Sequence, residues 1–339
     1  MDELVKQAIG LAEQRTRGMS SVPWKSDEPW RQSWHLYSAD KQQWHPIKDG
    51  SSQPRSSLST IKRLALYSWN IDFMLPYPDS RMGAAIRHLE SLTKHHQEGT
   101  ATVIFLQECL DSDLTLIAAE PWIQQHFAIT DTDTANWQSG HYGTTTLIDS
   151  RLPMLDVFRV HYEKTRMQRD GLFVDLSIPA ADGASKRIRL CNTHLESLAL
   201  EPPLWSAQME LCAKHMHDLE IAGAAVAGDF NAIQDFDRTL HSDNNLHDAY
   251  LKLGGVEDDA AAGHTWGQQA ATVQRERFGT SRMDKVFYCG DAMKCTEFER
   301  VGAGVEAKDQ TEREALVGLG FDKPWIKDHL GVKAVFEIE

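Results

Sequence analysis

The sequence predicts a mixed α/β (α+β) fold in which strands outnumber helices. From residue 62 onward, short apolar runs rich in β-branched and aromatic residues recur, as is typical of buried strands. Longer stretches with apolar residues at helical spacing separate some of them, at residues 80–97, 111–120 and 204–221. This pattern is compatible with two packed sheets that are flanked by helices.

The predicted strands are distributed over the whole of residues 61–339, which we expect to form the main domain. No internal repeat of fixed period and no long low-complexity tract interrupts them. In chain order, the strands are LALYSWN, ATVIFLQE, TTTLID, LFVDLSI, IRLCNTH, AAVAGDF, RMDKVFY and GVKAVFEI.

Residues 1–60 are predicted to form a separate N-terminal part. Residues 1–17 place apolar side chains on one face at helical spacing, which indicates an amphipathic helix that docks on the main domain or binds a partner. The tryptophan-rich stretch WHLYSADKQQWHPI predicts a hairpin, which either packs on the main domain or presents an aromatic recognition patch. Residues 51–60, SSQPRSSLST, are typical of a linker.

Composition indicates a globular protein of the nucleus and/or cytoplasm. The 339 residues are 41% hydrophobic and 25% charged, and no apolar run approaches the roughly 18 residues of a membrane span. The acidic start lacks the apolar stretch of a secretory signal. The five cysteines are odd in number and lack C-x-x-C spacing, which favours reduced thiols over disulfides or structural zinc.

The formal net charge of −14 argues against non-specific coating of nucleic acid, which requires a basic surface. A local groove around one phosphate stays compatible with this charge, particularly where a metal ion supplies positive charge. Charge alone therefore does not decide whether the substrate is a nucleic acid.

Several predicted strands end in polar residues for which a buried strand has no structural need. In α/β proteins, ligands lie beyond strand ends, because the sheet is rigid there and the loops line a cleft. Each residue alone could be a helix cap, a turn residue or a buried, hydrogen-bonded histidine. Six such endings in one chain are hard to explain by capping, and they are Asn70 with Asp72, Glu108, Asn192 with His194 and Glu196, Asp229 with Asn231, Asp284, and Asp328 with His329.

One group of these residues suits a hard divalent cation. Mg²⁺ prefers carboxylate and carbonyl oxygens, which Glu108, Asn70, Asp72 and Asp328 would supply. The sequence contains neither a Cys/His quartet nor an H-E-x-x-H motif, so zinc is a poor fit.

The other group suits hydrolysis of a phosphoester. His194 and His329 could donate to a phosphoryl oxygen whose negative charge grows in the transition state. Asp229 and Asn231, two residues apart, could hold a water and a phosphate oxygen, which is the requirement for activating that water. We expect Gly228, just before them, to let the chain turn as it leaves the sheet.

In this order and spacing, WNID, FLQE, NTHLES, GDFNAI, SRMDKVFY and DHLGV resemble the endonuclease/exonuclease/phosphatase superfamily, from about Leu64 to Glu339. Within it, WNID, MQRDGLFV, NTHLES and HTWGQQ most resemble tyrosyl-DNA phosphodiesterase 2, which hydrolyses the 5′-phosphotyrosyl bond left by a trapped type II topoisomerase. The resemblance implies a four-layer α/β/β/α sandwich of two packed mixed sheets flanked by helices.

The resemblance also implies a role for each candidate residue. It implies Mg²⁺, for which Mn²⁺ could substitute, with Glu108 as direct ligand and Asn70, Asp72 and Asp328 completing the site. The implied catalytic residues are Asp229 for the attacking water, Asn231 for that water and a phosphate oxygen, His194 and His329 for the scissile phosphate, and Asp284 for the tautomer of His329. The implied substrate-binding residues are Arg169, Trp266 and Asn192.

The implied function is that of a metal-dependent phosphoric diester hydrolase in DNA repair. Its partner would be a DNA 5′ end that can carry a covalent tyrosyl peptide, and the protein would be a monomer without membrane contact. The alternatives are another nuclease of the superfamily, an inositol or lipid phosphatase, and a non-catalytic module that binds phosphate. Two departures bear on the choice, because the similar phosphodiesterases usually have serine where this chain has Lys327 and threonine where it has Phe230.

Overall fold

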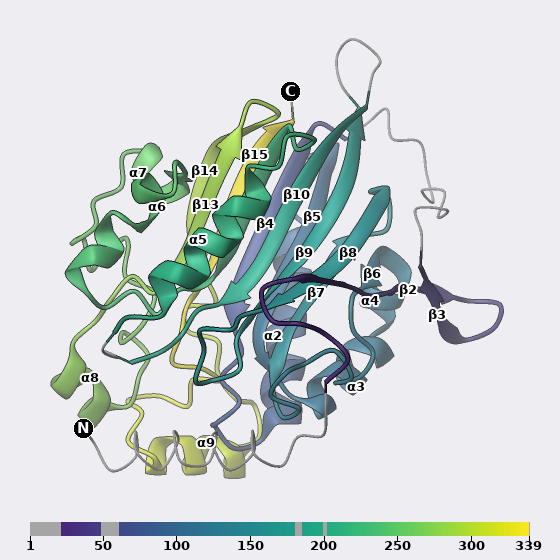
Figure 1. The fold of residues 1–339 in the computed structure, drawn as a ribbon. Helices are drawn as coiled ribbons and strands as arrows, with labels where there is room; N and C mark the ends of the chain where they lie inside the picture. Colours follow the sequence, from purple (N-terminus) through teal and green to yellow (C-terminus); the bar gives the residue numbers. More distant parts are fainter. Residues whose placement is uncertain (1–21, 49–60, 180–184, 199–201, 339) are drawn as a thin grey trace.

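The computed structural model describes residues 22–48, 61–179, 185–198 and 202–338 (Figure 1). The helix predicted over residues 1–17 and the linker predicted over 51–60 lie outside the described residues. None of the described helices is long and apolar enough to span a membrane.

Two mixed sheets form the centre of the molecule. The seven-stranded sheet has the order β1 (Pro29–Arg31), β8 (Met154–His161), β9 (Asp170–Pro179), β10 (Ser185–His194), β11 (Gly223–Asp229), β13 (Asp284–Gly290) and β12 (His247–Asp248). The eight-stranded sheet has the order β14 (Met293–Val301), β15 (Gly331–Ile338), β4 (Arg63–Asn70), β5 (Thr100–Cys109), β7 (Gly143–Asp149), β6 (Phe127–Ile129), β2 (Trp34–Ser38) and β3 (Gln43–Ile47).

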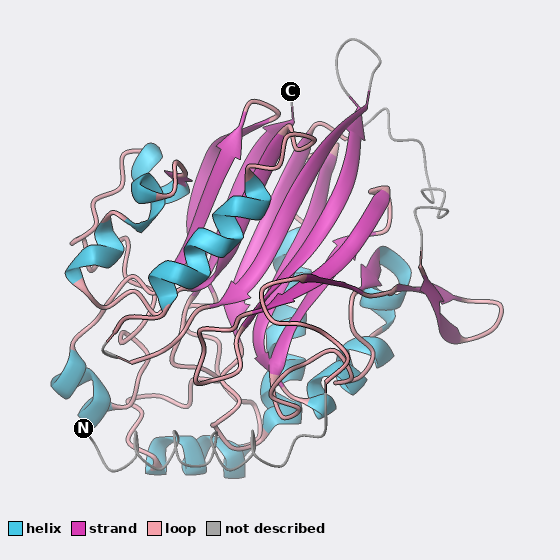
Figure 2. Ribbon diagram, viewed as in Figure 1, coloured by secondary structure: helices cyan, strands magenta, loops and turns pink. Residues whose placement is uncertain are grey.

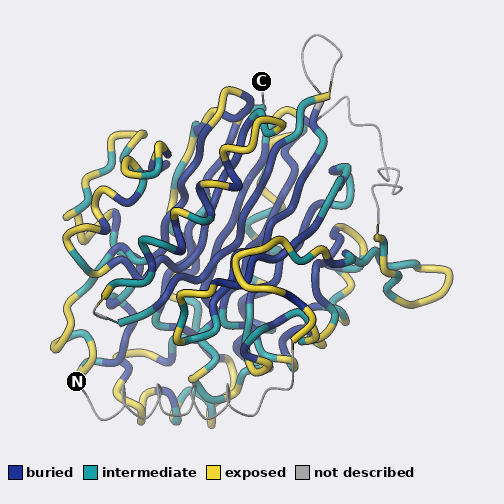
Figure 3. The backbone as a smooth tube through the Cα atoms, viewed as in Figure 1, coloured by how far each residue is buried: buried dark blue, intermediate teal, exposed yellow. Residues whose placement is uncertain are grey.

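The largest apolar core lies between the two sheets and draws side chains from both. Leu66 and Phe105 from the eight-stranded sheet belong to one buried cluster with Val174 and Leu190 from the seven-stranded sheet. Central strands are buried along nearly their whole length (Figure 3), so their sequences are continuous apolar runs rather than alternating ones.

Helices cover the outer faces of both sheets (Figure 2). α2 (Pro78–Thr93), α3 (Asp111–Ala119), α4 (Pro121–His126) and α9 (Gln310–Gly318) pack against the eight-stranded sheet, and α5 (Trp205–Met216) packs against the seven-stranded sheet. The shorter helices are η2 (Asp235–Arg238), α6 (Leu240–Asp243), α7 (Ala249–Lys252) and α8 (Thr272–Phe278). The predicted sandwich of two mixed sheets flanked by helices is confirmed.

The predicted hairpin forms, and it is β2 followed by β3. β2 is hydrogen bonded to β6, and β1, just before it, is hydrogen bonded to β8. Trp34 is buried in the core between the sheets, and the indole N–H of Trp44 donates to the carbonyl of Ala118 at 2.9 Å. The hairpin therefore extends the eight-stranded sheet, as in the packing alternative.

Two long strands were not among those predicted, β8 and β14. β8 carries Arg159, a fully buried guanidinium that pairs with Asp131 and Asp170. β14 alternates buried and exposed residues and contains several charged side chains. Charged residues inside both segments hide the apolar pattern of a strand.

Strand direction brings the polar strand ends to one side of the molecule. β4 runs parallel to β5, and β10 runs parallel to β11, so the carboxyl ends of each pair lie side by side. β15 is antiparallel to β4 and β13 is antiparallel to β11, which brings the starts of β13 and β15 to those same ends.

Candidate active site

A cavity of about 520 Å³ lies where these strand ends meet. Polar residues from four strand ends line it: Glu108, His194, His329, and Asp229 with Asn231, which both belong to the end of β11. The remaining described lining residues are Ser197, Leu198, Ile233, Trp266, Phe278, Thr280, Ser281 and Met283.

Asp229 is the centre of the polar part of this cavity and is only 1% exposed. Its Oδ1 accepts from the backbone N–H of Asn231 at 2.8 Å, and its Oδ2 accepts from Nδ2 of Asn70 at 2.9 Å. Oδ2 also lies 3.4 Å from Nε2 of His194 and 3.6 Å from Nε2 of His329. Burial alone would raise the pKa of Asp229, but the positive charge of His329 and the hydrogen bond from His194 outweigh it and hold that pKa below its ordinary value.

His329 is buried and paired with Asp284. Its Nδ1 lies 2.9 Å from Oδ2 of Asp284, whose own backbone N–H donates to Oγ1 of Thr265. Burial by itself would lower the pKa of His329. The carboxylates of Asp284 and Asp229 have the opposite and larger effect, so the pKa lies well above its ordinary value. The raised pKa favours the protonated ring, in which Nδ1–H donates to Asp284 and Nε2–H faces the cavity.

Arg169 determines the tautomer of His194. Nη1 of Arg169 lies 2.7 Å from Nδ1 of His194, and a guanidinium can only donate, so Nδ1 accepts. The ring proton is then on Nε2, which faces the carboxylates of Asp229 and Glu108, the latter at 3.7 Å. Arg169 is itself buried and is not among the residues that line the cavity, so it acts from behind His194.

The four residues expected to hold a metal lie together beside Asp229. Asn70 Oδ1 accepts from the backbone N–H of Asp72 at 2.8 Å, and Oε2 of Glu108 accepts from the backbone N–H of Phe73 at 3.1 Å. Asp328 Oδ2 accepts from the indole of Trp266 at 2.9 Å, whereas its buried Oδ1 has no hydrogen-bond partner among the described residues.

The charge of this group fits a divalent cation. Burial, together with the neighbouring carboxylates of Asp328 and Glu108, raises the pKa of Asp72 to about 7. These three carboxylates repel one another, and Asp328 has a buried oxygen without a partner among the described residues. Mg²⁺ or Mn²⁺ would neutralise their charge and would find the oxygen ligands that it prefers.

A different group, Asp229, Asp284 and His329, is the one among the described residues whose donor atoms all lie within 4.8 Å of one another. It is a poorer metal site, because the hydrogen bond between His329 and Asp284 already uses two of those atoms.

Three of the site residues have left-handed backbone conformations that non-glycine residues rarely adopt. The φ angles are 56° for Asp72, 58° for Glu108 and 49° for Asn231. The pairing of β5 with β7 shifts register between Leu106 and Cys109, which turns Glu108 out of the regular pleat. Such strain persists where the surrounding structure imposes it, and here it lies at the predicted site.

The three predicted substrate-binding residues lie in three different places relative to the cavity. Trp266 lines the cavity beside Phe278, with ring centroids 6.4 Å apart. Arg169 stands behind His194. Asn192 does not reach the cavity: it is fully buried, and its amide accepts from Gln107 at 2.8 Å and donates to the carbonyl of Thr145 at 2.9 Å. Because Gln107 and Thr145 belong to the other sheet, Asn192 holds the two sheets together.

Sequence reasoning missed the apolar wall of the cavity. Leu198, Ile233, Phe278 and Met283 line it together with Trp266. Leu198 and Ile233 follow β10 and β11, whereas Phe278 ends α8 and Met283 precedes β13. Single apolar residues at such scattered positions form no periodic pattern and carry no sequence signal.

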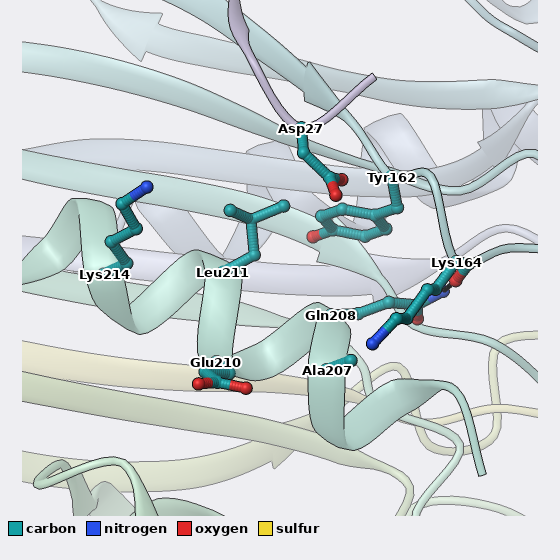
Figure 4. A pocket seen from close by; sticks show the side chains of 8 residues that line it. All are labelled: Asp27, Tyr162, Lys164, Ala207, Gln208, Glu210, Leu211 and Lys214. Atoms are coloured by element: carbon teal, nitrogen blue, oxygen red, sulfur yellow. Dashed lines mark hydrogen bonds between the residues drawn. The ribbon is translucent and has the colours of Figure 1, made fainter. Parts of the chain in front are cut away.

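Another cavity, of about 350 Å³, lies between α5 and the loop after β8 (Figure 4). Lys214 and Leu211 of α5 and Tyr162 line it, together with Asp27 from the N-terminal segment. None of the polar strand ends contributes to this cavity.

Gly228 lies within β11 rather than at a turn, which corrects the sequence-based expectation. A Cβ atom at this position would lie 1.7 Å from the carbonyl oxygen of Thr193 on β10. Glycine is required here because β10 and β11 approach closely, next to the paired residues His194 and Asp229.

We expect Gly228→Ala to lower the free energy of unfolding by about 2–3 kcal/mol, because the two strands must move apart. Urea denaturation measures this loss. Gly318→Ala, at the end of α9, is the matched control, since a Cβ there meets nothing within 4 Å and its stability should stay equal or rise by up to about 1 kcal/mol. Equal stability of Gly228→Ala and the wild type would contradict the proposed close approach.

Comparison with known families agrees with this geometry. The Endonuclease/Exonuclease/phosphatase family matches residues 67–305. The chain belongs to this family. Comparison with curated proteins gives no match.

Solved structures of the same fold include two TDP2 (tyrosyl-DNA phosphodiesterase 2) proteins. A truncated Caenorhabditis elegans TDP2 is 21% identical, with 81% of this chain and 97% of that chain covered and a TM-score of 0.59. D. rerio TDP2, complexed with single-strand DNA product, is 16% identical, with 81% and 99% covered and a TM-score of 0.59. The human Nocturnin catalytic domain with bound sulfate is 16% identical, with 82% and 95% covered and a TM-score of 0.53. The predicted superfamily is confirmed, and at these identities the structures establish the fold alone.

Proposed function

We propose that this member of the family is a Mg²⁺-dependent phosphodiesterase that hydrolyses the 5′-phosphotyrosyl bond of DNA or a close analogue. The observation that carries the proposal is that Asp229, His329 and Glu108 line one cavity, while the carboxylates of Asp72 and Asp328 lie close enough to Glu108 to raise the pKa of Asp72. This combination meets the needs of phosphoester hydrolysis: a water to activate, growing negative charge to stabilise and a phosphate to hold.

The chain's own residues divide these tasks. Asp229, ionised because of its lowered pKa, orients the attacking water and accepts its proton as the new P–O bond forms. The P–O bond to the tyrosyl oxygen breaks in the same displacement, and that oxygen leaves with the bonding electron pair as a phenolate, which takes a proton from solvent. His329 donates Nε2–H to a phosphoryl oxygen while Asp284 holds its ring. His194 supplies a second donor from Nε2, in the tautomer that Arg169 imposes, and Asn231 positions Asp229 through its backbone N–H.

Glu108, Asp72, Asp328 and Asn70 would hold the cation. When bound, it supplies positive charge for the phosphoryl oxygens and the leaving group. Loss of one carboxylate should therefore weaken both cation binding and turnover.

The lining of the cavity favours a nucleic-acid end over a polyphosphorylated inositol. Its described lining residues include no lysine and no arginine, whereas several phosphates would require several such cations. Trp266 and Phe278 instead offer aromatic faces on which a sugar or base can stack. We therefore propose a substrate with one phosphate at the site and stacking groups beside it.

The further parts of the proposal follow from this reaction. Residues 61–339 are the catalytic domain, and residues 1–60 are an N-terminal part whose strands complete the sheets. The protein acts as a monomer on a DNA 5′ end, with or without a tyrosyl peptide, in DNA repair. Its five cysteines are free and buried, in keeping with the reducing nucleus or cytoplasm.

A substrate panel tests the proposed function. We expect tyrosine release from a 5′-tyrosyl oligonucleotide with Mg²⁺ or Mn²⁺ and none with EDTA. Clear turnover of an abasic-site duplex or an inositol phosphate, without tyrosine release, would show that the substrate class is wrong. No turnover of any substrate with either metal would favour the non-catalytic phosphate-binding alternative.

A further inference from the structure

Arg81 of α2 is a buried arginine, 1% exposed, whose hydrogen bonds are unusual. All five of its N–H groups donate to backbone carbonyl oxygens, and none donates to a carboxylate. The acceptors are Pro76 at 2.8 Å from Nε, Ile71 at 2.9 Å and Ile326 at 3.2 Å from Nη1, and Asp72 at 2.8 Å and Leu75 at 2.8 Å from Nη2.

These carbonyls belong to two loops that are distant in sequence and adjacent at the site. The first loop, residues 71–77, follows β4 and carries Asp72. The second includes Ile326 and continues directly into Asp328 and His329. The two N–H groups of Nη1 thus join the loop of one predicted metal ligand to the loop that carries another.

The first loop needs such support because its backbone is strained. Asp72 has a φ of 56° and Tyr77 a φ of 60°, and neither is a glycine. Four carbonyls of residues 71–76 accept hydrogen bonds from the guanidinium of Arg81. The planar, rigid arrangement of arginine donors is suited to hold several carbonyls in one fixed geometry.

The positive charge of Arg81 lies near the acidic group of the site. The carboxylates that act on it most strongly are those of Asp72, Asp113, Asp328 and Glu108, and three of these belong to the acidic group of the site. Because its N–H groups are all bonded to carbonyls, the cation lies close to the carboxylates without occupying their oxygens. Those oxygens stay available to a metal ion.

We infer that Arg81 is a positioning residue of the cation site, which holds the Asp72 loop and the Asp328 loop in one fixed arrangement. This inference rests on the proposed function, because it assumes that the acidic group binds such an ion. The sequence alone indicates only that Arg81 lies in a helix, and the inference gives this residue a role at the site.

The test measures Mn²⁺ binding directly, by electron paramagnetic resonance of the full chain, and needs no substrate. We expect Arg81→Lys to bind Mn²⁺ about tenfold more weakly or worse, since lysine keeps the charge but has three donors and no planar fork. For the 5′-tyrosyl oligonucleotide at saturating Mg²⁺, kcat should fall while KM changes by less than about twofold, because substrate contacts are untouched.

Arg189→Lys is the matched control. Arg189 is also a buried arginine, but it pairs with Asp175 and Asp218 and donates to the carbonyl of His215, remote from the cavity. The control should lose stability without changing Mn²⁺ affinity. If Arg81 has only a structural role, Arg81→Lys should likewise lose stability and keep the Mn²⁺ affinity of the wild type. That result would overturn the inference.

If Arg81→Lys does not fold in buffer, Arg81→Gln and Arg81→Lys are compared in an osmolyte such as trimethylamine N-oxide, which favours the folded state. Wild-type Mn²⁺ affinity in either folded variant overturns the inference, and tenfold weaker binding in both supports it. Failure of the proposed function is seen separately, since it requires that the wild type bind no Mn²⁺ or release no tyrosine.

Discussion

Asp229→Asn should lower kcat by about 10²-fold to 10⁴-fold, the range expected when a residue that orients and deprotonates the attacking water is lost. Asparagine keeps the shape but cannot accept the proton. It also removes one of the carboxylates that keep His329 protonated. The measurement is the initial rate of tyrosine release at saturating Mg²⁺, with circular dichroism to show that the variant is folded.

Asp175→Asn is the matched control for this result. Asp175 is buried to the same extent, and it pairs with Arg189 on the neighbouring strand, away from the cavity. Its loss should destabilise the protein and leave kcat within about twofold of the wild type. A rate for Asp229→Asn within tenfold of the wild type would rule out Asp229 as the residue that activates the water.

Glu108→Gln should weaken Mn²⁺ binding by about 100-fold and lower turnover at fixed metal concentration at least as much. The amide removes a negative charge and leaves a neutral oxygen as donor. Without metal, the same variant should be about 1 kcal/mol more stable than the wild type, because Glu108 is one of the carboxylates that raise the pKa of Asp72. Lower activity with higher stability is the expected signature of a residue kept for function.

Urea denaturation in EDTA and Mn²⁺ titration measure these two effects. Glu210→Gln, an exposed residue of α5 at the cavity of Figure 4, should change neither quantity. Unchanged Mn²⁺ affinity in Glu108→Gln would contradict its role as a metal ligand, whatever the effect on turnover.

The central strands could be predicted because both of their faces are buried, which leaves an uninterrupted apolar run such as that of β5. The same logic fails for β8, where Arg159 is buried only because Asp131 and Asp170 reach it from other parts of the chain. A buried charge is compatible with a strand when its partners are in place, and those partners are separated from it in sequence.

Part of the site, like part of the fold, could be predicted from the sequence. Carboxylate, amide and histidine residues at strand ends indicated a phosphoester-cleaving site before the strand directions were known. Asn192 has the same sequence signal as His194, two residues later on β10, yet its amide joins the two sheets. Which side chains face the cavity and which face the core depends on sheet packing.

The sequence by itself determined the fold class, the family and the residue types available for catalysis, because apolar periodicity and short motifs are local properties of the chain. Only the tertiary structure decided the tautomer of His194, the protonation of His329, the left-handed backbone of Glu108 and the position of Arg81 beneath two loops. Each of these depends on burial or on contacts between segments that are distant in sequence, and such contacts form only when the strands pair and the helices and loops pack against them.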